Sequence, residues 1–147
     1  MKLKSYVNGA WSEGRGEPTL LVNPTTEETL AEASTGGIDF EAALNHARFV
    51  GGPALRAMTF AERAACLKGM YEALYARREE LLELSILNGG NTRNDAKFDV
   101  DGATGTLLAY VAHGEQLGDR RLLVDGETER LGRNPRYAGK HILTPLR

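Results

Sequence analysis

Residues 59–90, TFAERAACLKGMYEALYARREELLELSILNGG, form the stretch of sequence that decides the fold. The first four residues have the capping-box pattern, in which the hydroxyl of Thr59 and the carboxylate of Glu62 satisfy the first free backbone amides of a helix. Asn88-Gly89-Gly90 supplies a C-terminal stop. The pattern therefore predicts one helix over 59–87. Its apolar stripe needs a covering partner and consists of Leu67, Met70, Tyr71, Leu74, Leu81, Leu82 and Ile86.

The residues before this helix read as short strands joined by turns. Asn8-Gly9 is a strong hairpin signal, and it separates β-prone residues 5–7 from a return strand that begins at 10–11. Residues 19–22 form a second β run, which Asn23-Pro24 stops. In residues 29–34 apolar and polar side chains alternate, which predicts a strand with one solvent-exposed face.

After Gly36-Gly37 the apolar period changes from two to 3.6. Asp39 is expected to cap a helix that Gly51-Gly52-Pro53 ends. The side chains at core-facing spacing in this helix are those of Phe40, Ala43, Leu44 and Ala47.

A third helix is expected from about Asn94-Asp95 to Gln116, with Gly102 and Gly105 inside it. Each glycine costs roughly 1 kcal/mol relative to alanine, and their spacing puts both on one face. That face is expected to meet another backbone in tight helix packing or, alternatively, a ligand. Beyond Gly118 the chain turns polar and irregular, and residues 141–147, HILTPLR, are a strand candidate.

Composition bounds the classes of function. The 147 residues carry 18 basic and 20 acidic side chains, a net charge of −2, so nothing favours nucleic acid or an anionic membrane as a partner. A single cysteine excludes an internal disulfide and a multi-thiolate metal site. There is neither a secretory signal pattern nor an apolar run long enough to span a bilayer. A cytoplasmic location is the simplest expectation.

The residues alone define no complete active site. Cys66 lies two turns into a helix, where we expect a small buried hydrophobe rather than an activated nucleophile. The three histidines share no metal-ligand spacing, and no glycine-rich phosphate loop is present. Glu79 and Glu80 are expected on a solvated helix face. Asp99 and Asp101, beside the glycine face, are the acidic residues that retain some functional interest.

The order of these motifs resembles the N-terminal part of an aldehyde dehydrogenase. Residues 6–11, YVNGAW, resemble the opening hairpin of that family, and 22–28, VNPTTEE, its following turn. Residues 59–63 and 88–90 resemble the capped start and the stop of its helix. A narrower resemblance, to the aldehyde dehydrogenases that act on coenzyme A thioesters in phenylacetate and benzoyl-CoA breakdown, rests on residues 53–60, 62–65, 99–102, 105–107 and 141–147.

The resemblance implies an α/β fold that is incomplete in this chain. Residues 1–147 would form the N-terminal part of an aldehyde dehydrogenase domain, with a β-hairpin, strands and three helices that pack on a Rossmann-like nucleotide-binding domain. It further implies an enzyme that oxidises a CoA-linked semialdehyde by thiolate attack, hydride transfer to NADP or NAD, and thioester hydrolysis. The segments that hold the family's catalytic residues would follow these 147 residues, so this chain alone is expected to be inactive and to bind no cofactor.

The same resemblance gives the chain two structural roles. The hairpin would belong to the oligomerisation region of a homo-oligomer. Gly102, Ala103 and Thr106 would line the mouth of the substrate tunnel, where small side chains leave room for a bulky substrate. The alternative function is that of a non-catalytic helical interaction module or an inactive gene remnant.

Overall fold

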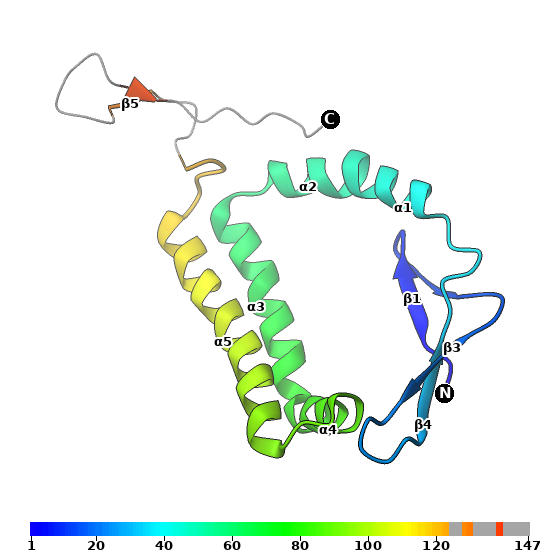
Figure 1. The fold of residues 1–147 in the computed structure, drawn as a ribbon. Coiled ribbons are helices and arrows are strands. Elements are labelled where there is room, and N and C mark those ends of the chain that lie inside the picture. The colour runs from blue at the N-terminus through cyan, green and yellow to red at the C-terminus, as the bar shows by residue number, and fades with distance from the viewer. Residues whose placement is uncertain (124–127, 131–137, 140–147) are drawn as a thin grey trace.

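The computed structural model describes residues 1–123, 128–130 and 138–139. Short strands from the first 33 residues lie on one side, and helices from the middle of the chain lie on the other. A helical rod that begins at Phe40 links the two parts (Figure 1). The fold therefore contains the β region followed by helices that the sequence predicts. The strand candidate over 141–147 falls outside the described residues.

The first strands, β1 (Lys4–Val7) and β2 (Ala10–Glu13), form an antiparallel hairpin. Asn8 and Gly9 turn the chain with φ angles of 53° and 82°, a left-handed conformation that asparagine and glycine tolerate. Opposite each other in the register, Tyr6 and Trp11 meet edge to face with their ring centroids 5.2 Å apart. The predicted hairpin is confirmed.

A second antiparallel pair consists of β3 (Thr19–Val22) and β4 (Thr29–Ala33). The turn between them is organised by Asn23, which is buried and whose Oδ1 accepts a hydrogen bond from the Thr25 backbone N–H at 2.8 Å. Residues 1–3 run beside β4, where Leu3 N–H donates to the Glu32 carbonyl at 2.8 Å. The last pair is β5 (Glu129–Arg130) with β6 (Ala138–Gly139).

The helix that begins after Asp39 does not end at the Gly-Gly-Pro sequence, so that prediction is wrong. Asp39 caps α1 (Phe40–His46) as expected, because its Oδ1 accepts from the Ala42 N–H at 2.8 Å. The chain then continues through a π-helical turn, η1 (Ala47–Gly51), into α2 (Gly52–Ala57). The Gly52 N–H donates to the Ala47 carbonyl five residues back. This wider turn lets Pro53, which has no N–H, continue a helical path.

The predicted helix over 59–87 is two helices, α3 (Phe60–Ala76) and α4 (Arg78–Gly89), and α4 runs across the foot of α3 (Figure 1). The capping box is confirmed: Glu62 N–H donates to Thr59 Oγ1 at 3.1 Å, and Thr59 N–H donates to Glu62 Oε2 at 2.7 Å. The break lies at Arg77, whose φ and ψ are −109° and 20°. Gly90, at a φ of 67°, ends α4 as the stop signal predicts.

The long helix α5 (Arg93–Leu117) matches the third predicted helix to within about one residue at each end. Its N-cap is Thr92, and Gly118 ends it at a φ of 64°. The turn after α5 also caps α3, because Phe60 N–H donates to the Arg120 carbonyl at 2.8 Å and Ala61 N–H to the Gly118 carbonyl at 2.9 Å. The start of α3 is thereby tied to the end of α5.

Few side chains of the described residues are buried. Leu82 and Val111 are the large hydrophobic ones among them, and the others are small. Phe40 and Leu44 on α1 are 63% and 50% exposed, so the expectation that they face a core is wrong for this chain. The stripe predicted over 59–87 is covered in part: Leu82 is buried, Met70 is 53% exposed, and most of the other members are half-buried. Hydrophobic residues at helical spacing mark a face that needs burial, and the described residues cover these faces only in part.

Candidate functional surfaces

A close contact between helices lies where α3 crosses α5. A Cβ placed on Gly114 would lie 2.7 Å from the Cβ of Ala64 and 3.0 Å from the carbonyl oxygen of Phe60. Both distances are shorter than ordinary contacts, so only glycine lets these two helices approach this closely. The sequence pattern pointed to Gly102 and Gly105, and not to Gly114, as the glycines of a close contact. The signal was present, because Gly114 continues the helical spacing of Ala96, Thr104 and Val111, which are the buried residues of α5.

Ion pairs join the start of α4 to α5. Arg78 Nε lies 2.6 Å from Asp101 Oδ1, and its Nη2 lies 2.7 Å from Asp101 Oδ2, a two-bond geometry. Glu79 lies between Arg78, at 2.7 Å, and Arg93 at the start of α5. Glu79 and Glu80 are exposed as the sequence predicts, although both are paired with arginines.

These pairs shift the ionisation of their members. The Arg78 guanidinium, through its hydrogen bonds to the carboxylate, holds the pKa of Asp101 below its ordinary value. In the same way Arg93 lowers the pKa of Glu79. A carboxylate with a lowered pKa stabilises the folded chain above its unfolded pKa of about 4, and that contribution is lost as the pH falls through the folded value. The ion pairs are therefore intact at neutral pH.

Two apolar hollows flank the helices. One, of about 540 Å³, lies between α3 and α5, and its polar lining consists of Arg63, His113 and Gln116. Its apolar lining is Phe60, Ala64, Leu67, Tyr110, Gly114 and Leu117. The other, of about 550 Å³, lies between the N-terminal strands and α4. It is lined by Met1, Leu3, Leu21, Leu30, Ala31, Leu84, Ser85, Leu87 and Asn88.

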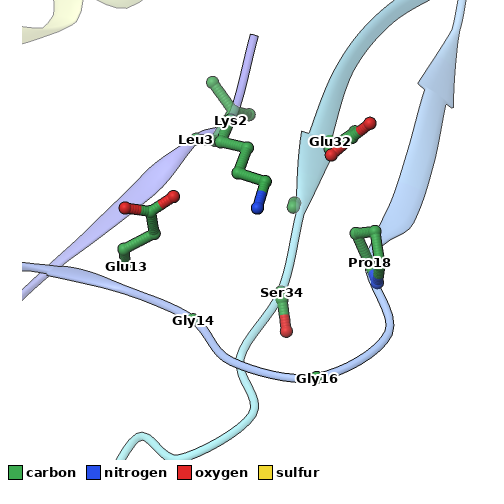
Figure 2. Close-up of a pocket in the computed structure, with 9 residues that line it drawn as sticks. Lys2, Leu3, Glu13, Gly14, Gly16, Pro18, Glu32 and Ser34 are labelled. Atoms are coloured by element: carbon green, nitrogen blue, oxygen red, sulfur yellow. The ribbon is translucent and has the colours of Figure 1, made fainter.

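A third, much smaller hollow of about 20 Å³ separates the N-terminal residues from the loop that follows β2. In Figure 2 the side chain of Lys2 extends between Glu13 and Glu32, and Ser34 lies below them. Ser34 Oγ donates to the Arg15 carbonyl at 2.9 Å and so holds the loop against the end of β4. The space is close to that of one water molecule, which fits a structural cleft and not a substrate site.

The three predicted tunnel residues lie together on α5. Gly102, Ala103 and Thr106 are all exposed, and Thr106 Oγ1 donates back to the Gly102 carbonyl at 2.8 Å. None of them lines the three hollows. A Cβ on Gly102 or Gly105 would meet nothing within 4 Å, so the expected tight packing at this face is wrong within the described residues.

Cys66 and the histidines belong to no metal-binding cluster within the described residues. Cys66 is exposed, which corrects the expectation that it is buried, because α3 turns this side away from α5. Among the described residues no group of three or more His, Cys, Asp or Glu side chains could hold a metal ion. His113 contacts the ring of Tyr110 at a centroid distance of 6.3 Å. No helix within the described residues is long and apolar enough to cross a membrane.

In a Rossmann-type site, a strand, a glycine-rich turn and a helix N-terminus together cradle the phosphates of a dinucleotide. The described strands form antiparallel pairs, and the strand β4 is followed by α1 only after residues 34–39. Gly36 lies in this segment, but a Cβ there would meet the Arg15 carbonyl oxygen at 1.9 Å, so its surroundings are filled by protein backbone. The connection from β4 to α1 therefore lacks the open glycine-rich turn of such a phosphate cradle.

Residues 11–139 match the aldehyde dehydrogenase family, which is most of the chain. The chain therefore belongs to the aldehyde dehydrogenase family. It is 45% identical over 146 residues to the 3,4-dehydroadipyl-CoA semialdehyde dehydrogenase of Aromatoleum evansii. That alignment covers 99% of this chain and 28% of the relative, so the chain spans little more than a quarter of the length of that protein.

Solved structures show the same fold. The aldehyde dehydrogenase 21 of Physcomitrella patens superposes with a TM-score of 0.73 at 20% identity, over 92% of this chain and 27% of that one. The NAD-dependent benzaldehyde dehydrogenase of Corynebacterium glutamicum gives a TM-score of 0.70 at 24% identity, over 90% of this chain and 27% of that one. The elements described above are thus one part of the aldehyde dehydrogenase fold, as the sequence predicts.

Proposed function

We propose that residues 1–147 are the N-terminal section of an NAD(P)-dependent aldehyde dehydrogenase that oxidises a CoA-linked aliphatic semialdehyde to the acid in aromatic-compound degradation. The observation that carries this proposal is the 45% identity, over nearly the whole chain, to a relative named for a CoA-linked semialdehyde. We further propose that the whole enzyme is cytoplasmic and forms a homo-oligomer, and the family resemblance supports both points. The proposal allows either NADP or NAD as the cofactor of the whole enzyme.

In this proposal the section acts as scaffold and tunnel wall and supplies no catalytic residue. Its exposed apolar faces, such as those of Phe49 at 74% and Phe98 at 82% exposure, would be covered by the remaining part of the enzyme. Gly102, Ala103 and Thr106 would line the substrate tunnel. Their exposure on one side of α5 and their lack of side-chain bulk support this role.

The experiment is a chimera in which residues 1–147 replace the corresponding section of the Aromatoleum evansii enzyme. We expect it to reduce NADP or NAD with 3,4-dehydroadipyl-CoA semialdehyde at a kcat/KM at least about tenfold above that with succinate semialdehyde, which lacks the CoA moiety. The host enzyme is the positive control, and residues 1–147 alone, expected to bind no nucleotide, are the negative control. A folded chimera that prefers succinate semialdehyde would refute the substrate class.

Ala103→Phe in the chimera tests the tunnel wall. A phenyl ring at this exposed position of α5 would narrow a passage beside it, so the KM for the CoA-linked substrate should rise by about tenfold while the KM for succinate semialdehyde changes little. The matched control is Ala109→Phe, also exposed on α5 but outside the predicted tunnel set. If Ala103→Phe changed the KM values for the two substrates equally, the assignment of Ala103 to the tunnel wall would be refuted.

A further inference from the structure

The face of α5 that packs in this chain is made of small side chains. Ala96, Thr104 and Gly114 are buried, and the one larger member of the stripe is Val111. Thr104 Oγ1 is used inside the helix, where it donates to the Val100 carbonyl at 2.9 Å. A narrow stripe of small groups lets two helices come close but gives little resistance to rotation of one helix about its own axis. Hydrogen bonds tie the C-terminal end of α5 to the start of α3, so the rotation of its N-terminal half depends on a further contact.

The ion pairs at the start of α4 provide such a contact. Asp101 lies about 60° around α5 from Thr104, on the flank of the packed stripe. Arg78 binds it with two hydrogen bonds of 2.6 and 2.7 Å, and the Arg78 side chain is 23% exposed. A two-bond guanidinium–carboxylate pair fixes the direction of both groups as well as their distance.

A second link acts on the same helix. Glu79, the next residue of α4, pairs with Arg93, which begins α5. Positions 93 and 101 are eight residues apart, which is about 12 Å along a helix. Two attachments at that separation, both from the first two residues of α4, define the rotation of α5 and its tilt together. Exposed pairs contribute little to stability, so their structural effect is mainly geometric.

We propose that Asp101 is a positioning residue of the substrate tunnel. Its pair with Arg78 sets the rotation of α5 and so the direction in which Gly102 and Ala103, the next two residues, face the substrate. Gly102 follows Asp101 by about 100° around the helix. A rotation of α5 that moves Asp101 therefore also moves Gly102 and Ala103 in the proposed tunnel wall. This inference rests on the proposed function, because it needs the tunnel to lie at Gly102 and Ala103.

The test uses Asp101→Asn in the chimera. The amide keeps the size of the side chain but removes the charge and one acceptor from the two-bond pair. We expect the KM for 3,4-dehydroadipyl-CoA semialdehyde to rise by about fivefold, with the KM for succinate semialdehyde and both kcat values within about twofold. Asp101→Glu, which keeps the carboxylate, should restore most of the loss. Glu115→Gln, an exposed change on the same helix that touches none of these pairs, should alter nothing.

The outcomes separate this inference from the proposed function. If the unsubstituted chimera does not prefer the CoA-linked substrate, the proposed function fails. If it does prefer that substrate but Asp101→Asn lowers only the thermal midpoint, or changes both KM values equally, then the pair is merely structural and the positioning role is refuted. A selective rise in KM that Asp101→Glu reverses supports the role.

Discussion

Gly114→Ala is expected to destabilise the assembled enzyme by about 1 to 3 kcal/mol, although alanine is the better helix former. The added Cβ would lie 2.7 Å from the Cβ of Ala64 and 3.0 Å from the carbonyl oxygen of Phe60. Both atoms belong to α3: Ala64 is 2% exposed, and the Phe60 carbonyl is part of the helix backbone. Neither can rotate away as a long side chain would. The two helices must therefore separate, which loosens the packing along their whole length.

The measurement is the midpoint of urea-induced inactivation of the chimera, compared with that of Gly105→Ala. Gly105 lies on the same helix, but a Cβ there meets nothing within 4 Å, so this variant should keep its stability within about 1 kcal/mol. The pair of variants separates helix propensity, which both gain, from the close contact, which only Gly114 makes. Equal midpoints for the two variants would contradict the assignment of Gly114 as the close-contact glycine.

Features that depend on neighbouring residues were predictable from the sequence. Asn8-Gly9 adopts the positive φ angles that a two-residue hairpin requires. Thr59 and Glu62 cap each other across three residues, and both hydrogen bonds of the box form. Each motif carries its own partner within four residues of chain, so no tertiary information is needed to recognise it.

The predictions that failed concern one turn next to a residue whose partner lies far along the chain and one local turn of unusual type. The helix break at Arg77 has no glycine or proline, and apolar periodicity continues through it. The turn there precedes Arg78, whose partner Asp101 lies 23 residues away. The helix that was expected to end at Gly51-Gly52-Pro53 instead continues. A single π-type turn accommodates Pro53, which has no backbone N–H to donate. Neither arrangement is specified by the spacing of hydrophobic residues.

The candidate site was predictable only in part for the same reason. The sequence predicts that Gly102 and Gly105 share a packed face, whereas in the structure Gly102 and Thr106 are exposed on α5, one helical turn apart and hydrogen-bonded. What that face meets is not encoded in these residues, so its role in a tunnel remains a prediction. The close contact at Gly114 requires knowing that α3 crosses α5 at Ala64. A small residue on a packing stripe indicates such a crossing but does not give its partner.

Residues 1–147 expressed alone are expected to form a loosely packed, self-associating chain that binds the dye ANS strongly. Among the described residues, 20 large hydrophobic side chains are exposed, whereas Leu82 and Val111 are the large ones that are buried. The α1–α2 rod has no buried residue at all. Helices with caps and intrahelical hydrogen bonds can persist without a core, so we expect strong far-UV circular dichroism with a weak near-UV signal.

The matched comparison is the chimera, which contains the same 147 residues together with the rest of an aldehyde dehydrogenase. If the exposed faces are surfaces that the remainder of the enzyme covers, ANS fluorescence per residue should fall several-fold in the chimera, and the near-UV signal should appear. Phe49→Gln in the isolated chain should reduce self-association without changing the far-UV spectrum, because the Phe49 side chain is 74% exposed. A sharp cooperative unfolding transition in the isolated monomer would show instead that these residues form a core by themselves, and the requirement for a covering partner would be wrong.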